Sequence, residues 1–174
     1  IEDEVGRSKE RRPVAHYFNT YEEPYLPPSW VISECVTLGI WSRIYTVLRD
    51  PNDRKAIARR FGVHQPEVFE SWLHTVTYLR NVVAHHGQVI GVTLRVSPAN
   101  YKGKRVNGVI TGLNLGPDNR TLHGGVKVIH YLLCQSGLPQ TFKQDLLQLL
   151  ANYPADFAAT AGFPNGWETQ PGWA

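Results

Sequence analysis

The sequence predicts an all-α fold, a bundle of amphipathic helices interrupted by one long irregular segment. Apolar residues recur at helical spacing over residues 29–49, 51–61, 66–86, 120–136 and 139–152. Residues 87–118 lose that period and contain six glycines and two prolines. Long segments of this kind interrupt compact domains as loops or short hairpins. We therefore expect a helical bundle with a long irregular insertion or a small hairpin around residues 87–118.

The first three expected helices have recognisable ends. Ser29 is a candidate N-cap of the helix over residues 29–49. Asp50 caps the second helix, Pro51 takes its first position and Gly62 stops it. The third helix, residues 66–86, is the clearest because its apolar side chains form one stripe. The members of the stripe are Phe69, Trp72, Leu73, Val76, Leu79 and Val83.

Large aromatic residues are expected in the core. Trp30, Trp41 and Trp72 are interpreted as core residues rather than as platforms on which bases stack. Apolar residues this large in a C-terminal tail usually dock the tail on the core. The tail residues expected to do so are Phe163, Trp167 and Trp173.

Composition narrows the class of protein. The formal net charge is +3, which permits an anionic partner without requiring one. No apolar run approaches the roughly 20 residues that span a bilayer, and the charged N-terminus lacks the apolar centre of a signal peptide. Cys35 and Cys134 are too few for a disulfide framework and are expected to be buried free thiols. We expect a cytoplasmic protein that has no membrane partner.

The chain is expected to divide into an extended, charged N-terminal segment, residues 1–28, and a helical domain, residues 29–174. The abrupt charged start suggests the remnant of a longer N-terminal region. No cofactor or metal is expected. His85 and His86 are the nearest approach to a zinc pair, but adjacent helical residues point about 100° apart and no second pair of ligands has recognisable spacing.

Arg80 and His85 near the end of the third helix are the candidate catalytic residues. Arg80 projects near the middle of the apolar stripe, where a guanidinium is costly to bury without an anion. Asn81 and His85 lie at i and i+4, so a hydrogen bond between them would fix the tautomer of the imidazole. Arg80 and His85 diverge by about 140°. Either the arginine reaches round, the helix end is distorted, or two subunits contribute to one site. The alternative is structural: a buried ion pair for Arg80 and a polar helix end at His85.

Other candidates have two interpretations each. Glu34 either follows the helix-dipole preference or is the buried partner of Arg80. The basic residues after Tyr101 either bind a phosphate backbone or form a solvated loop. The members of that basic run are Lys102, Lys104 and Arg105. Residues 53–55 and 59–60 are interpreted as a solvated helix face.

Several short motifs follow one another along most of the chain. They are His16-Tyr17, Pro27-Pro28-Ser29-Trp30 with Glu34, Leu38-Gly39-Ile40-Trp41-Ser42, Phe61-Gly62, Ser71-Trp72-Leu73-His74, Leu79-Arg80-Asn81-Val82-Val83-Ala84-His85-His86 and Gly162-Phe163-Pro164. In this order and spacing they resemble the Abi-like (abortive infection, AbiD/AbiF group) family of the HEPN ribonuclease superfamily.

The resemblance implies a HEPN-type helical bundle that is the C-terminal portion of such a protein. Arg80, Asn81 and His85 match the superfamily's Arg-polar-x-x-x-His motif, and His86 would support them. Such proteins are typically metal-independent endoribonucleases that pair two motifs across a homodimer. The implied setting is an abortive-infection or toxin-type phage defence, with RNA as substrate and an RNA or protein antitoxin as a further partner.

The chain also departs from the family pattern after the two histidines. The family usually continues with Gly/Ser-Arg-Leu-Trp-Asn, whereas this chain has Gln88, Ile90 and Gly91 at the positions of the arginine, tryptophan and asparagine. Those positions are candidates for RNA contacts. The alternative function is therefore a catalytically weak or inactive RNA-binding or interaction module of a defence complex.

Overall fold

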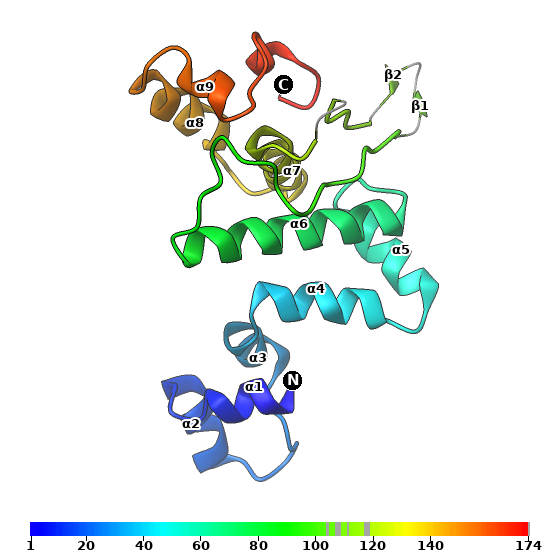
Figure 1. Cartoon of the computed structure of the whole chain (residues 1–174). Coiled ribbons are helices and arrows are strands. Elements are labelled where there is room, and N and C mark those ends of the chain that lie inside the picture. The colour runs from blue at the N-terminus through cyan, green and yellow to red at the C-terminus, as the bar shows by residue number, and fades with distance from the viewer. Residues whose placement is uncertain (104, 107–108, 111, 117–118, 174) are drawn as a thin grey trace. The chain divides into compact units, whose positions relative to one another are not determined.

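The computed structural model describes residues 1–103, 105–106, 109–110, 112–116 and 119–173 (Figure 1). The chain forms two compact units, residues 1–44 and residues 45–174, which are described separately. The division at residue 28 that the sequence suggests stays a prediction. The fold is all-α, as expected, with one short two-stranded ladder in the described part of the chain.

The first unit contains α1 (Glu2–Arg7), α2 (Arg12–Thr20), α3 (Ser29–Cys35) and the start of α4 (Leu38–Val47). Helices therefore occupy most of the segment that was expected to be extended. Acidic residues fill the first turn of α1, where the helix dipole favours them, and Arg7 in the last turn pairs with Glu4 at 2.8 Å. A small core lies under these helices and consists of Val5, Val14 and Cys35, with Leu26, Val31 and Ile32 packed against it.

The single helix expected over residues 29–49 is wrong, because the chain breaks between α3 and α4. Val36, the residue after α3, is extended, and the Thr37 hydroxyl accepts a hydrogen bond from the backbone N–H of Ile40 at 3.4 Å. This bond resembles an N-cap, which begins a new helix. The core assignments of two tryptophans are also wrong. Trp30 is 72% exposed, on the side of α3 opposite Cys35, and Trp41 is 40% exposed.

The second unit is built on a long helix, α6 (Pro66–Ala84), which packs against α7 (Leu122–Gln135) (Figure 1). Gly125 of α7 permits the close approach, since a Cβ there would collide with Leu79. Trp72 is fully buried at this contact, as predicted. The main core comprises Tyr45, Ala58, Val63, Val68, Phe69, Trp72, Tyr101, Leu113, Leu115 and Val128.

α5 (Pro51–Arg60) precedes α6 and follows the predicted capping. The Asp50 carboxylate accepts a hydrogen bond from the Asn52 N–H at 2.8 Å, and Pro51 is the first helical residue. Gly62 has φ 69°, and the bonds Gly62 N–H to Arg59 O and Val63 N–H to Ala58 O close the helix in a Schellman motif. Val63, the residue after the glycine, is fully buried and anchors this end in the core.

The segment between α6 and α7 is irregular and contains a small hairpin, as expected. β1 (Arg105–Val106) pairs antiparallel with β2 (Val109–Ile110), and Tyr101 bridges to Leu113. The segment is tied to α6 at Ala99. Its carbonyl accepts a bond from the Trp72 indole, and its N–H donates to the Ser71 hydroxyl, both at 2.8 Å.

The remaining elements are α8 (Phe142–Ala151), α9 (Phe157–Thr160) and a 3₁₀ turn, η1 (Trp167–Thr169). The tail docks as predicted, because Phe163, Trp167 and Trp173 are all buried in a second core cluster. Cys134 is exposed, contrary to expectation, because it lies in the last turns of α7 and points about 120° away from the buried Val128. Within the described residues, no helix is long and apolar enough to cross a membrane.

Candidate functional site

The candidate catalytic residues lie at the C-terminal end of α6. The helix ends at Ala84, His85 is the C-cap residue, and His86 follows with φ 55°. The His86 N–H donates to the Val83 carbonyl at 3.0 Å and the Gly87 N–H to the Val82 carbonyl at 2.7 Å. These two bonds define a Schellman motif with a histidine at the left-handed position that glycine usually occupies.

Gly87 is required by this turn. A Cβ at residue 87 would lie 2.7 Å from Cγ1 and 3.0 Å from the carbonyl oxygen of Val82. His86 is the one non-glycine residue with positive φ in the described part of the chain. A left-handed non-glycine residue costs roughly 1 kcal/mol or more, and such residues cluster at functional sites. The helix thus ends with a strained histidine followed by a glycine that cannot be enlarged.

The side chains at this end of α6 face solvent. Arg80, Asn81, His85 and His86 are all exposed, and Val83 is 58% exposed. The expected burial of Arg80 is wrong, although by angle Arg80 lies within the stripe, about 20° round the helix from the buried Phe69. Val83 lies on the same side of the helix as the buried members of the stripe, yet it is exposed. The core therefore no longer covers α6 at this turn.

Arg80 and Asn81 contact each other. Nη1 of Arg80 donates a hydrogen bond to Oδ1 of Asn81 at 3.1 Å. The hydrogen bond expected between Asn81 and His85 is therefore replaced by one between Asn81 and Arg80. No hydrogen bond joins Arg80 to His85 among the described residues. Arg80 therefore has no carboxylate partner here, and its remaining N–H groups are free to bind an anion.

A shallow hollow of about 450 Å³ lies along this face of α6. Asn81 and His85 line it, together with His74, Thr77, Tyr78, Val82 and Gly87. The Thr77 hydroxyl is buried and makes no hydrogen bond in the described structure. The motif alone did not indicate that His74 and Tyr78 would line the hollow. Their spacing could have done so, since His74, Tyr78 and Asn81 lie at i, i+4 and i+7 on one side of the helix.

The other predicted residues are Glu34 in the first unit and the basic run after Tyr101 in the second unit. Glu34 is exposed in the last turn of α3, so both the buried-partner and the dipole interpretations are wrong. Its backbone carbonyl accepts a bond from Nη1 of Arg11 at 2.6 Å. Lys102 is exposed, Lys104 lies outside the described residues, and Arg105 is described only by its backbone in β1.

Sequence reasoning missed a second group of titratable residues, which is buried on α7. His123, Lys127 and His130 are each no more than 4% exposed. The Trp173 indole donates to Nε2 of His123 at 3.4 Å, and its ring stacks on His130 with centroids 4.8 Å apart. The Nζ of Lys127 donates to the Asn114 carbonyl at 3.0 Å. No sequence motif marks this set, because its role follows from the docking of the tail.

Burial sets the protonation of this group. Desolvation, together with the smaller effect of the neighbouring Lys127 charge, lowers the pKa of His123 to about 4. Burial likewise lowers the pKa values of Lys127 and His130, with Lys143 adding to the effect on His130. These histidines are neutral near pH 7. No group of three His, Cys, Asp or Glu side chains suited to a metal ion is present in the described part of the chain.

Comparison with known proteins gives one match. A family model described as Abi-like protein matches residues 1–91, just over half of the chain. The match includes every candidate residue from Glu34 to His86 and ends within the irregular segment. No curated protein and no solved structure matches the chain.

Proposed function

Because the chain belongs to the Abi-like protein family, we propose that it acts in abortive-infection phage defence as a metal-independent endoribonuclease of the HEPN type. The observation that carries this proposal is the end of α6. Arg80, Asn81, His85 and His86 are all exposed within one and a half turns of helix and the cap that follows. An arginine without a carboxylate partner and an exposed histidine are the groups that phosphodiester cleavage needs.

The proposed reaction uses the RNA's own 2′-hydroxyl. His85 accepts the 2′ proton as the oxygen attacks the adjacent phosphorus, and the bond from phosphorus to the 5′ oxygen breaks. A proton returns to that leaving oxygen from the imidazolium or from a second histidine. Arg80 binds the non-bridging oxygens and stabilises the charge that grows on them. The products are a 2′,3′-cyclic phosphate and a 5′-hydroxyl.

The test compares matched RNA and DNA oligonucleotides in EDTA with the full chain. We expect cleavage of RNA only, with cyclic phosphate ends, because DNA lacks the nucleophile. A strict requirement for added divalent metal, or equal cleavage of DNA, would exclude this mechanism.

We also propose that the working form is a homodimer in which Arg80 of one subunit faces His85 of the other. The two residues diverge on one helix, and a phosphate must touch both. Mixing Arg80→Ala with His85→Ala protein tests this. If sites are composite, half of the mixed dimers are hybrids with one intact site each, so about a quarter of the parental activity returns. An inactive mixture, with hybrid dimers demonstrated, would assign each site to a single chain.

One observation favours a second candidate, an RNA-binding module with little turnover. Gln88 stands where the family usually has arginine, and its Nε2 donates to the Ile90 carbonyl at 2.8 Å. That side chain is engaged within its own loop and carries no charge for a phosphate. Tight RNA binding without cleavage, by the same end of α6, would support this candidate over the first.

A further inference from the structure

α5 and the loop before it form one of the basic segments of the chain. Residues 49–60 contain five of the chain's 18 Lys and Arg but only two of its 15 Asp and Glu, which gives the segment a formal charge of +3. Residues 7–12, at +3, and residues 95–105, at +4, are comparably basic. Charge gathered in a short segment raises the local potential even when the total charge is small.

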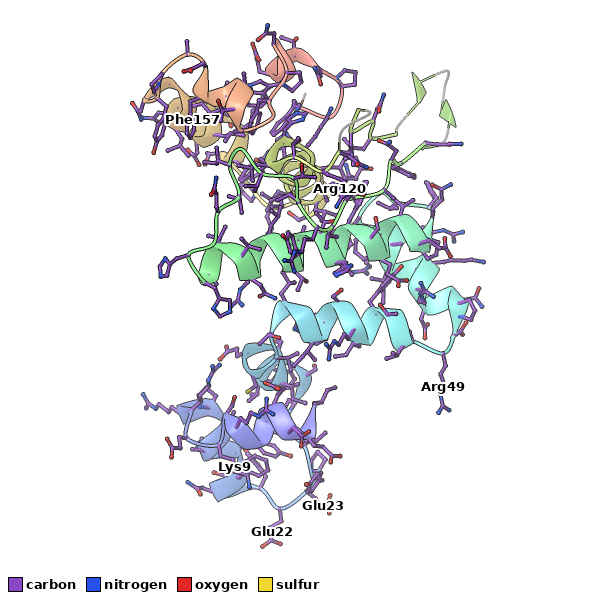
Figure 2. All side chains as sticks on the ribbon, viewed as in Figure 1. Lys9, Glu22, Glu23, Arg49, Arg120 and Phe157 are labelled. Carbon is purple, nitrogen blue, oxygen red and sulfur yellow. The ribbon has the colours of Figure 1, made fainter. Side chains whose placement is uncertain are left out.

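The exposed cations of this segment have no acidic partners. Arg54, the half-buried member, pairs with Glu70 at 2.5 Å and so fixes α5 to α6. Lys55, Arg59 and Arg60 are exposed, and none forms an ion pair among the described residues. We call these three residues the α5 basic surface. Figure 2 shows Arg49 pointing away from the ribbon in the loop that precedes α5.

The helix dipole accounts for only part of this pattern. Cations are favoured in the last turn of a helix, which explains Arg59 and Arg60. It does not explain Lys55, which lies one turn earlier and beside Arg59 on the helix surface. Lys55 and Arg59 are neighbours at i and i+4, whereas Lys55 and Arg60 point about 140° apart, so the mutual repulsion that an external anion would relieve lies between Lys55 and Arg59.

We propose that the α5 basic surface binds the phosphate backbone of the RNA that is cut at the end of α6. This inference rests on the proposed function in taking RNA as the natural ligand. Exposed lysine and arginine bind backbone phosphates by charge and read no sequence, and the segment keeps a charge of +3 after Asp50 and Asp53 are counted. The packing of Ala58 in the core and the Arg54–Glu70 pair hold the surface rigidly on α6.

The geometry sets the length of RNA required. α5 and His85 lie at opposite ends of α6 (Figure 1). The helix has 19 residues, which at 1.5 Å each separates its ends by about 28 Å. A stacked strand with 3.4 Å between nucleotides covers that distance in about eight nucleotides. An RNA of three nucleotides, even when fully extended, reaches only one end of α6.

The experiment measures binding of a labelled 20-nucleotide single-stranded DNA, which offers phosphates but no 2′-hydroxyl to cut. Parent protein is compared with Lys55→Gln/Arg59→Gln/Arg60→Gln over a range of salt. A matched control, Lys9→Gln/Arg12→Gln/Arg95→Gln, removes three exposed cations elsewhere. Three lost phosphate contacts reduce the slope of log affinity against log salt by about 2. Between 50 and 200 mM salt the parent then loses roughly twentyfold more affinity than the α5 variant.

The control variant should keep the parental slope of log affinity against log salt. An unchanged slope in the α5 variant would overturn the inference. A cleavage arm compares RNAs of 3 and 20 nucleotides. The longer RNA should be cut faster by the parent, and the α5 variant should cut both alike. If the parent cuts no RNA, the proposed function fails. The salt dependence of DNA binding still tests whether the α5 basic surface binds phosphates. A slope change in both triple variants would indicate diffuse charge attraction and would also overturn it.

Discussion

Two pairs of histidines in the second unit have opposite environments. His85 and His86 stand exposed at the end of α6, beyond the core, in a turn that has a strained backbone. His123 and His130 lie inside the molecule on α7, where Trp173 contacts both rings. The exposed pair can meet a ligand and exchange protons with it. The buried pair is neutral near pH 7 and holds the C-terminal tail.

The difference shows that residue type alone does not identify a site of proton transfer. All four histidines belong to α6 or α7 or directly follow them, and two of them are structural. What separates the pairs is whether an aromatic tail covers them. Each of the following predictions alters one side of this comparison.

The largest effect is expected from His85→Ala. Loss of a proton-transfer group lowers RNA cleavage by about 10²–10⁴-fold. The fold should survive, because the side chain is exposed and the turn depends on backbone bonds. His16→Ala removes an exposed histidine from α2 and serves as the control in the same assay. Parental cleavage by His85→Ala would remove this residue from the mechanism.

Trp173→Ala should destabilise the second unit by about 3–5 kcal/mol, because it empties a fully buried site and uncovers both α7 histidines. Urea unfolding measures the loss. Trp30→Ala removes the same side chain from a 72% exposed position and should change stability by less than about 0.5 kcal/mol. Equal losses from the two substitutions would contradict the burial described here.

Acid should weaken the fold through His123. An unfolded imidazole binds its proton near pH 6.5, whereas folded His123 binds one only near pH 4. The unfolded state therefore holds more protons in that window, and stability falls as pH drops from 6.5 to 4. We expect this pKa shift to contribute about 2 kcal/mol to the free energy of unfolding. This is less than a fully buried imidazole would contribute, because His123 also lines a hollow of about 590 Å³.

The control is His123→Gln, which can still accept the Trp173 hydrogen bond but cannot titrate. Urea unfolding at pH 7 and pH 4.5 should show a smaller acid loss for this variant. An acid loss equal to that of the parent would mean that His123 does not carry the effect.

The smallest effect is expected from His86→Gly, which should stabilise the protein, whereas Trp173→Ala and acid destabilise it. Glycine relieves the positive φ at residue 86, which should raise the free energy of unfolding by about 0.5–1 kcal/mol. RNA cleavage should fall in the same variant if the side chain contacts the substrate. Gly62→Ala is the reverse substitution and serves as the control, because it adds a side chain at φ 69° in the equivalent turn after α5. It should destabilise by about 1–2 kcal/mol.

Much of the fold was predictable because local signals agree with the packing. The cap at Asp50, the stop at Gly62 and the stripe through Trp72 each determine one structural feature, and all three appear as expected. The break between α3 and α4 was missed, because an unbroken apolar pattern hid the cap at Thr37. The exposure of Trp30 was missed for a related reason, since a short helix buries only one side.

The candidate site stays a prediction, and its geometry was not predictable from the sequence. Arg80, Asn81 and His85 were singled out by the resemblance to a family motif, and the structure places all of them in solvent at one helix end. The left-handed backbone of His86 was missed because helix termination there depends on Gly87 fitting against Val82. The buried group on α7 was missed because Trp173 is 50 residues from His123 in sequence. Only tertiary packing brings them together.

The most direct test of the central claim follows the imidazole NMR signals of all seven histidines while a 2′-O-methyl RNA of 20 nucleotides is added. The methyl group blocks the nucleophile, so the complex persists during the measurement. We predict that the signals of His85 and His86 shift as the RNA binds, while those of His123 and His130 stay in place. Shifts confined to the α7 pair, or bound RNA that leaves His85 and His86 unchanged, would contradict the placement of the site at the end of α6.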